Sequence, residues 1–126
     1  MKPISTKNAP KPAGHYSQAI VHNGQVFVSG QLPIDPKTGE KILGPIEEQT
    51  GQVLRNVQAI LEAAGSKIEQ VLKVTIYIPD MNLWGQVNAV YADFFKDHRP
   101  ARAVVPTREL HHGFKIEMEV IAAVGE

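Results

Sequence analysis

Arg102 is the residue of this sequence best suited to hold an anionic substrate. It stands in the segment PARAVVP, where its near neighbours are small or apolar. A guanidinium in such surroundings either pairs with a carboxylate of the protein or binds an anion from solution, and its planar fork suits bidentate capture of a carboxylate. The pattern alone favours the first possibility, a structural pair between Arg102 and Glu117 or Glu119.

Other chemistry-bearing motifs are scarce. The side chains of the one histidine pair, His111 and His112, would point to opposite faces of a strand, so we expect polar loop residues there rather than a metal site. The sequence has no cysteine, which excludes disulfides, thiolate catalysis and cysteine-bound zinc. It also lacks nucleophile elbows, phosphate-binding loops, metalloprotease helices and dinucleotide fingerprints.

The first third of the chain predicts a hairpin followed by a loop. The turn over 22–24 contains Asn-Gly, whose residues tolerate positive φ, so we predict that it joins a strand over 17–21 to a returning strand over 25–31. Residues 1–16 show no periodicity and are expected to form an extended arm. The Pro- and Gly-rich stretch over 32–44 predicts a loop.

Two amphipathic helices are predicted next. Pro45 is suited to the first turn of the first helix, and Gly65 is suited to its end. Apolar residues recur at helical spacing between these two positions. The second helix is predicted to begin at about Asn82 and to stop before Arg99.

Three more strands are predicted, over 71–79, 101–105 and 114–124. In the second of these, alternation assigns Arg102 to the face away from the helices, the same face as Glu117. The order ββαβαββ predicts an α+β fold in one domain over residues 1–126, with two helices covering one face of a mixed sheet and the other face open.

The last strand suggests what covers the open face. Its helix-facing set is apolar throughout, and its opposite set ends in Ile121 and Ala123, which are also apolar. A strand that is apolar on both faces is expected to be buried on both, which favours a homo-oligomer. The alternative is a single exposed isoleucine, which is common on protein surfaces.

The composition restricts the classes of partner that we expect for this protein. Lysine plus arginine equals aspartate plus glutamate at 13 each, so the net charge is zero, without the basic excess that is typical of nucleic-acid binding. The apolar stretches are too short for a membrane span, and the N-terminus has no apolar core of a signal peptide. We therefore expect a cytoplasmic protein without nucleic-acid or membrane partners.

Several segments, in order, resemble the reactive intermediate/imine deaminase (RidA/YjgF) family along nearly the whole chain. They are NAPKPAGHYSQ, VSGQLPIDPKTGE, EEQTGQVLRNVQAILEAAG, VNAVYADFF, and PAR followed by KIEMEVIA. The resemblance implies a chorismate-mutase-like subunit that assembles as a homotrimer with a central β-barrel.

The resemblance also implies a reaction. Family members hydrolyse 2-imino or enamine acids, such as 2-aminoacrylate and 2-iminobutanoate, to 2-oxo acids and ammonia, with no metal or organic cofactor. It implies that Arg102 binds the substrate carboxylate and that Glu117 orients the attacking water. The positions that match the lining or support of the intersubunit pocket are Tyr16, Ser29, Gly30, Asn88 and Val104, the last in place of a frequent cysteine.

Three departures from the family pattern bear on substrate preference. His15 replaces a proline, the segment VPTRELHHG differs from the usual one, and the stretch before PAR is about two residues shorter. Two other functions remain open. One is a non-catalytic trimer that binds 2-oxo acids in a regulatory role. The other is an endoribonuclease, against which the zero net charge and the lack of a suitably placed histidine pair count.

Overall fold

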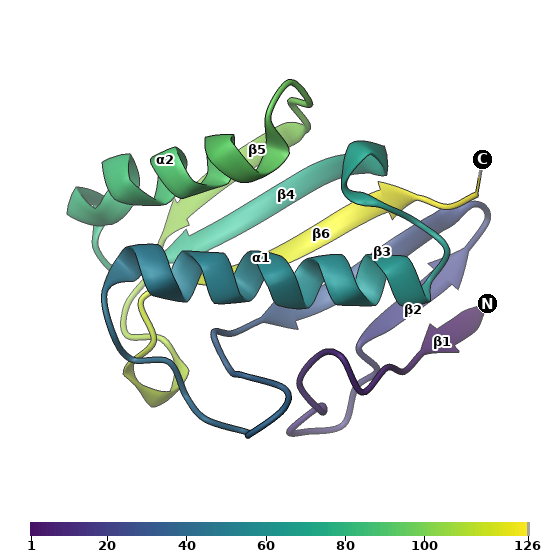
Figure 1. The fold of residues 1–126 in the computed structure, drawn as a ribbon, viewed down its shortest axis with the longest axis horizontal. Coiled ribbons are helices and arrows are strands. Elements are labelled where there is room, and N and C mark those ends of the chain that lie inside the picture. Colours follow the sequence, from purple (N-terminus) through teal and green to yellow (C-terminus); the bar gives the residue numbers. More distant parts are fainter. Residues whose placement is uncertain (126) are drawn as a thin grey trace.

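In the computed structural model, which describes residues 1–125, two helices lie across one face of a six-stranded sheet (Figure 1). The strands are β1 (Lys2–Ile4), β2 (Ala19–His22), β3 (Gln25–Gln31), β4 (Val71–Ile78), β5 (Ala101–Pro106) and β6 (Glu117–Ala123), and the helices are α1 (Ile46–Ala63) and α2 (Trp84–Phe95). Their spatial order is β1-β2-β3-β6-β4-β5. Only β4 and β5 pair in parallel, so the sheet is mixed and the predicted fold class is confirmed.

The N-terminal part contains the predicted hairpin and one strand more than predicted. Asn23 and Gly24 have φ of 51° and 74°, the left-handed conformations that a two-residue hairpin turn needs. Residues 2–4 pair with β2 as the outer strand β1, so the arm is not free of the sheet. A three-residue edge strand is too short to leave a recognisable alternation in the sequence.

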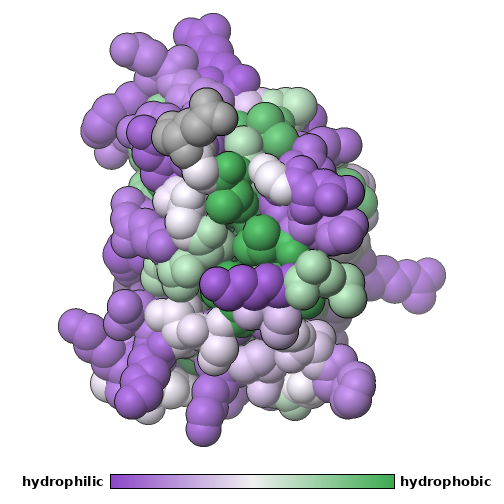
Figure 2. Space-filling model, turned by 90° about the vertical axis from the view of Figure 1, so that its right-hand side faces the viewer, coloured by the Kyte–Doolittle hydropathy of each residue, from purple (hydrophilic) through white to green (hydrophobic). Residues whose placement is uncertain are grey.

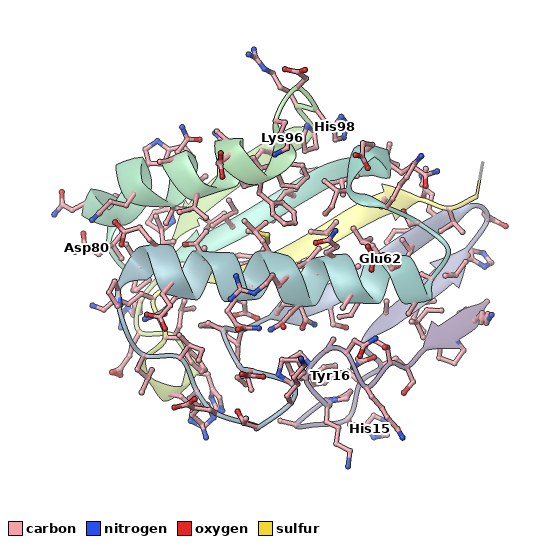
Figure 3. All side chains as sticks on the ribbon, in the orientation of Figure 1. His15, Tyr16, Glu62, Asp80, Lys96 and His98 are labelled. Atoms are coloured by element: carbon pink, nitrogen blue, oxygen red, sulfur yellow. The ribbon has the colours of Figure 1, made fainter. Side chains whose placement is uncertain are left out.

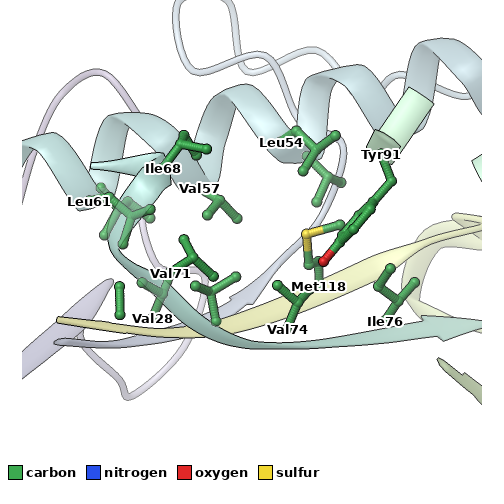
Figure 4. Packing of buried hydrophobic residues seen from close by; sticks show 14 of the residues in the cluster. Val28, Leu54, Val57, Leu61, Ile68, Val71, Val74, Ile76, Tyr91 and Met118 are labelled. Atoms are coloured by element: carbon green, nitrogen blue, oxygen red, sulfur yellow. The ribbon is translucent and has the colours of Figure 1, made fainter. Parts of the chain in front are cut away.

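Helix α1 supplies most of the cover of the sheet. It begins directly after Pro45 and ends before Gly65, whose φ of 81° favours glycine. Leu54 and Val57 point from it toward Val74 and Met118 of the sheet (Figure 4). Full burial of each such side chain contributes roughly 1.5–3 kcal/mol. Within residues 1–125, neither helix combines the length and the apolar character that crossing a membrane requires.

Helix α1 also carries buried amides that fix two connecting segments. Asn56 donates to the carbonyl oxygens of Leu32 and Ile34 at 3.1 and 3.0 Å. The side chain of Gln49 accepts the backbone N–H of Lys115 at 3.0 Å. This bond takes the N–H of Lys115 out of strand pairing, and β6 begins only at Glu117, three residues later than the predicted strand.

The face of the sheet away from the helices exposes large apolar side chains. Phe27 is 43% exposed and Leu72 is 44% exposed, and Ile121 lies opposite Phe27 in the pairing of β3 with β6. Viewed from the end of the molecule at which the C-terminus lies, apolar residues form a band flanked by polar ones (Figure 2). In comparison with Figure 1, that view shows the sheet from its end, and the open face that the sequence predicted is the one on which Phe27 and Ile121 lie.

Candidate active site

Arg102 lies on the helix-covered side of the sheet. It stands opposite Val74 in the parallel pairing of β5 with β4, and paired residues share a face. Val74 is buried under the helices, so the prediction that Arg102 lies on the open face is wrong. The error arose because β5 is an edge strand with small or apolar residues on both faces, so that alternation does not show which face the helices cover.

The Arg102 side chain contacts three residues of α2. Its Nη1 donates to Asn88 Oδ1 at 3.0 Å. Its Cζ lies 4.5 Å from the ring centroid of Trp84 and 4.8 Å from that of Tyr91, within the range of cation–π attraction. Val104 follows Arg102 on the same face of β5 and packs against the core. We call Asn88, Arg102 and Val104 the arginine group.

A groove of about 500 Å³ runs from Arg102 along the C-terminal end of α2. Figure 3 shows Lys96 and His98 at this end of the helix. Arg99 also lines the groove, and none of its lining residues in the described part of the chain is acidic. Its electrostatic character therefore suits an anion.

Glu117 lies on the other face, against a bulge in β3. Val28 pairs with Val120, but the next pair joins Gln31 to Met118, so β3 carries one extra residue at Ser29–Gly30. Oε2 of Glu117 lies so close to Gly30 that a β-carbon there would collide with it. Only glycine leaves room for the carboxylate in this position.

Ser29 and Tyr16 complete this second cluster. Ser29 Oγ donates to the carbonyl oxygen of Ser17 at 2.6 Å, which joins the bulge to the segment that carries Tyr16. Tyr16 lines a small depression of about 60 Å³ together with Gly30 and the histidine pair. We call Tyr16, Ser29, Gly30 and Glu117 the glutamate group.

The surroundings of Glu117 favour its protonated form. Half-burial raises the pKa of Glu117, and the negative charge of Glu119 raises it further, whereas His111 acts in the opposite direction. Glu119 itself accepts a hydrogen bond from the hydroxyl of Tyr77 at 2.5 Å. A carboxylate with a raised pKa is a stronger base, as proton abstraction from water requires.

The arginine and glutamate groups lie on opposite faces of the sheet. Glu117 pairs with Tyr77 of β4, on the face away from the helices, whereas Arg102 pairs with Val74 on the helix side. Strand β4 also separates their two strands. A structural pair of Arg102 with Glu117 or Glu119 inside one subunit, which the pattern alone favoured, is therefore excluded.

Two residues that contact Arg102, Trp84 and Tyr91, are not among the site residues that the sequence predicts. Their positions carried a usable signal, since Trp84, Asn88 and Tyr91 are spaced by four and three residues and so share one face of a helix. In residues 1–125, no group of three or more histidine, aspartate or glutamate side chains is arranged to hold a metal ion.

Comparisons with known proteins identify close relatives. The model of the family described as Endoribonuclease L-PSP matches residues 6–124. A RutC family protein of Pyrococcus horikoshii is 52% identical over 94% of both chains. A Salmonella typhimurium protein named 2-iminobutanoate/2-iminopropanoate deaminase is 43% identical over 96% of both. A crystal structure of a Thermotoga maritima protein, provisionally described as an endoribonuclease, is 47% identical and matches with a TM-score of 0.96, covering 100% of this chain and 99% of that one.

Proposed function

The chain belongs to the YjgF/RidA family, whose model is described as Endoribonuclease L-PSP, and on that basis we propose that it hydrolyses reactive 2-imino acids to 2-oxo acids. The names of relatives at 40–43% identity, 2-iminobutanoate/2-iminopropanoate deaminase, support this reaction. The observation that carries the proposal is the pair of groups that the fold prepares, a guanidinium free of carboxylate partners and a half-buried glutamate.

Arg102 binds the substrate carboxylate in this proposal. Its fork can donate two parallel hydrogen bonds, which fix both the position and the plane of the carboxylate. The bond to Asn88 occupies one Nη1 hydrogen and leaves the other donors of the fork available. Fixing the carboxylate also fixes the adjacent C=N carbon, because the two are directly bonded.

Glu117 activates the water that attacks this carbon. The carboxylate accepts a proton from water as the water oxygen bonds to the carbon of the protonated imine. The nitrogen of the resulting carbinolamine then receives that proton from Glu117, and the C–N bond breaks. Glu117 takes the hydroxyl proton as the carbonyl forms and ammonia leaves, and this proton passes to the ammonia to give ammonium. One water is consumed for each ammonia released, and no atom changes its oxidation state, so the reaction needs no oxidant or reductant.

The site that we propose lies between subunits of a homotrimer. The arginine and glutamate groups lie on opposite faces of one sheet, which supports a pocket that takes one group from each of two neighbours. The exposed apolar residues of the open face, Phe27 and Leu72 among them, support an assembly in which that face is covered.

Imine decay provides the test. We expect the protein to accelerate the loss of 2-iminobutanoate generated in situ, and Glu117→Gln to abolish this while 2-oxobutanoate still binds. Glutamine is nearly isosteric but is no base, so the loss should fall on kcat. If the native protein binds 2-oxobutanoate without accelerating imine decay, it is a non-catalytic binder and the proposal fails.

A further inference from the structure

One face of helix α2 surrounds the guanidinium of Arg102. Trp84, Asn88 and Tyr91 follow one another at helical spacing, and all three contact this side chain. The two rings, which we call the aromatic pair (Trp84 and Tyr91), lie 4.5 and 4.8 Å from Cζ. The amide of Asn88 meets an N–H at the edge of the guanidinium instead.

The aromatic rings and a carboxylate would use different properties of the guanidinium. A ring attracts the cationic charge as a whole, whereas a carboxylate binds the N–H groups. The aromatic pair therefore restrains the side chain without competing for the donors that a carboxylate needs. Restraint matters here because Arg102 is exposed on an edge strand, where an arginine has many rotamers to lose.

The aromatic pair is anchored to the hydrophobic core through Tyr91. This residue is only 6% exposed, and its ring packs on Phe95 with centroids 4.6 Å apart. Its hydroxyl points down toward Met118 and the sheet (Figure 4) and, within the part of the chain that the structure describes, has no hydrogen-bond partner. Burial raises the pKa of Tyr91 and the neighbouring charge of Arg102 lowers it, and burial has the larger effect, so the ring stays neutral beside the cation.

We propose that Trp84 and Tyr91 are positioning residues, which hold the Arg102 fork in the orientation that captures the substrate carboxylate. Neither residue needs to touch the substrate. The inference rests on the proposed function in taking the ligand to be a 2-imino or 2-oxo acid, but the contacts that it invokes lie within one chain. It assigns a functional consequence to a tryptophan that is half-buried and not required to fill the centre of the core.

Trp84 can serve as a fluorescent probe of this contact, because it is the single tryptophan of the chain. Intrinsic fluorescence therefore reports on the residue that touches Arg102. We expect Arg102→Ala to change the emission of Trp84 in the absence of any ligand. In the native protein we expect a saturable change on titration with 2-oxobutanoate.

Substitutions at Trp84 test the positioning role. Trp84→Leu should raise the Kd of 2-oxobutanoate, measured by calorimetry, by about 3- to 30-fold, the range of a partly desolvated cation–π contact. It should also lower kcat for 2-iminobutanoate, because a misdirected carboxylate misplaces the C=N carbon. Trp84→Phe keeps an aromatic face and should restore most of both. The matched control is Phe94→Leu, which changes a partly buried aromatic residue of the same helix that packs on Phe95, and it should behave as the native protein.

The outcomes separate this inference from the proposed function. If the native protein is active and folded Trp84→Leu binds and turns over like it, the positioning role is wrong and the proposed function stands. If Phe94→Leu is impaired as much as Trp84→Leu, the effect is general loosening of α2 and the inference also fails. If the native protein neither binds nor reacts, the proposed function fails, and the positioning role fails with it. The emission of Arg102→Ala tests the contact of Trp84 with Arg102 independently of any ligand. An unchanged spectrum then overturns the inference.

Discussion

At the scale of single residues, the reaction that we propose depends on the charge of Glu117. Its pKa is raised first by burial and then by Glu119, which lies on the same face, while His111 opposes both. The group therefore loses its proton at a pH above the ordinary range of glutamate. Because the deprotonated form is the base, the rate should rise with pH as Glu117 ionises.

Glu119→Gln tests this electrostatic account. Removing the negative charge removes one of the two causes that raise the pKa of Glu117, so that pKa should fall. The acid limb of the kcat/KM profile should then move to lower pH, while the plateau rate changes little. A pH–rate profile of both proteins measures this. A limb that stays in place would mean that burial alone sets the pKa, and a shift to higher pH would contradict the account altogether.

Arg102→Ala should abolish activity, and Arg102→Lys should restore little of it. Charge-assisted hydrogen bonds contribute about 1.5–3 kcal/mol each, so losing a bidentate pair costs about 3–6 kcal/mol, or some two to four decades in kcat/KM. Lysine keeps the charge but offers a compact donor in place of the fork. Steady-state kinetics on 2-iminobutanoate provide the measurement.

Folding is the control for these variants. Arg102 is exposed and has no carboxylate partner among residues 1–125 of its own subunit, so the alanine variant should melt within a few degrees of the native protein. Dissociation or unfolding would indicate a structural role in the assembly. A folded variant with native activity would mean that another group binds the carboxylate.

At the scale of elements, the bulge in β3 is the feature that admits Glu117. The extra residue at Ser29–Gly30 interrupts the pairing with β6 opposite the carboxylate. The loop that follows is fixed by Asn56, whose amide donates to Leu32 and Ile34, so α1 stabilises the segment that leaves the bulge. Strand, bulge and loop are thus positioned by buried hydrogen bonds.

Gly30→Ala should displace Glu117 and lower kcat/KM by about a hundredfold, the typical cost of misplacing a catalytic group by about 1 Å. The new methyl group would collide with Oε2 of Glu117, which must move. Gly85→Ala is the matched control, because a β-carbon there meets no atom within 4 Å and alanine favours a helix by up to about 1 kcal/mol. Steady-state kinetics should therefore show a loss of kcat/KM for Gly30→Ala and none for Gly85→Ala, and thermal melting should show no destabilisation of Gly85→Ala. Equal activities would show that Glu117 does not need its present position.

Sequence periodicity was sufficient to predict the helices and the main strands. It was insufficient to predict on which face of the sheet a side chain of β5 lies. The 3.6-residue repeat between Pro45 and Gly65 and the Asn-Gly turn each have one physical interpretation, and both predictions are confirmed. Strand β5 is different, because its burial depends on where α2 ends and on pairing with β4 rather than on its own residues. The predicted orientation of Arg102 was therefore wrong. The family resemblance nevertheless identified Arg102 as a residue of the predicted site. The homotrimer remains a prediction.

At the scale of the whole molecule, the arrangement of the two groups predicts that assembly has a chemical role. One subunit presents Arg102 on the helix side and Glu117 on the open face. If each pocket takes one group from each of two neighbours, an isolated subunit has both residues and no complete site. Activity should then depend on oligomerisation as well as on sequence.

Mixing two inactive variants tests this arrangement. Arg102→Ala and Glu117→Gln subunits, unfolded together in equal amounts and refolded, should form mixed trimers in which about a quarter of the pockets contain both native residues. About a quarter of native activity should return, and light scattering should give about three subunits per particle. Mixing the folded proteins without exchange is the control. No recovery in verified mixed trimers would place both residues in the same subunit's share of the pocket.

The order of the strands also leaves β1 and β5 as the two outer strands of the sheet, and each contains a proline. Pro3 of β1 and Pro106 of β5 offer no N–H to an approaching chain, and Lys2 adds a charge beside Pro3. Outer strands with unpaired backbone groups are otherwise templates for open-ended aggregation. The prolines in the two outer strands should therefore disfavour edge-to-edge pairing between molecules, and with it fibre formation at high protein concentration.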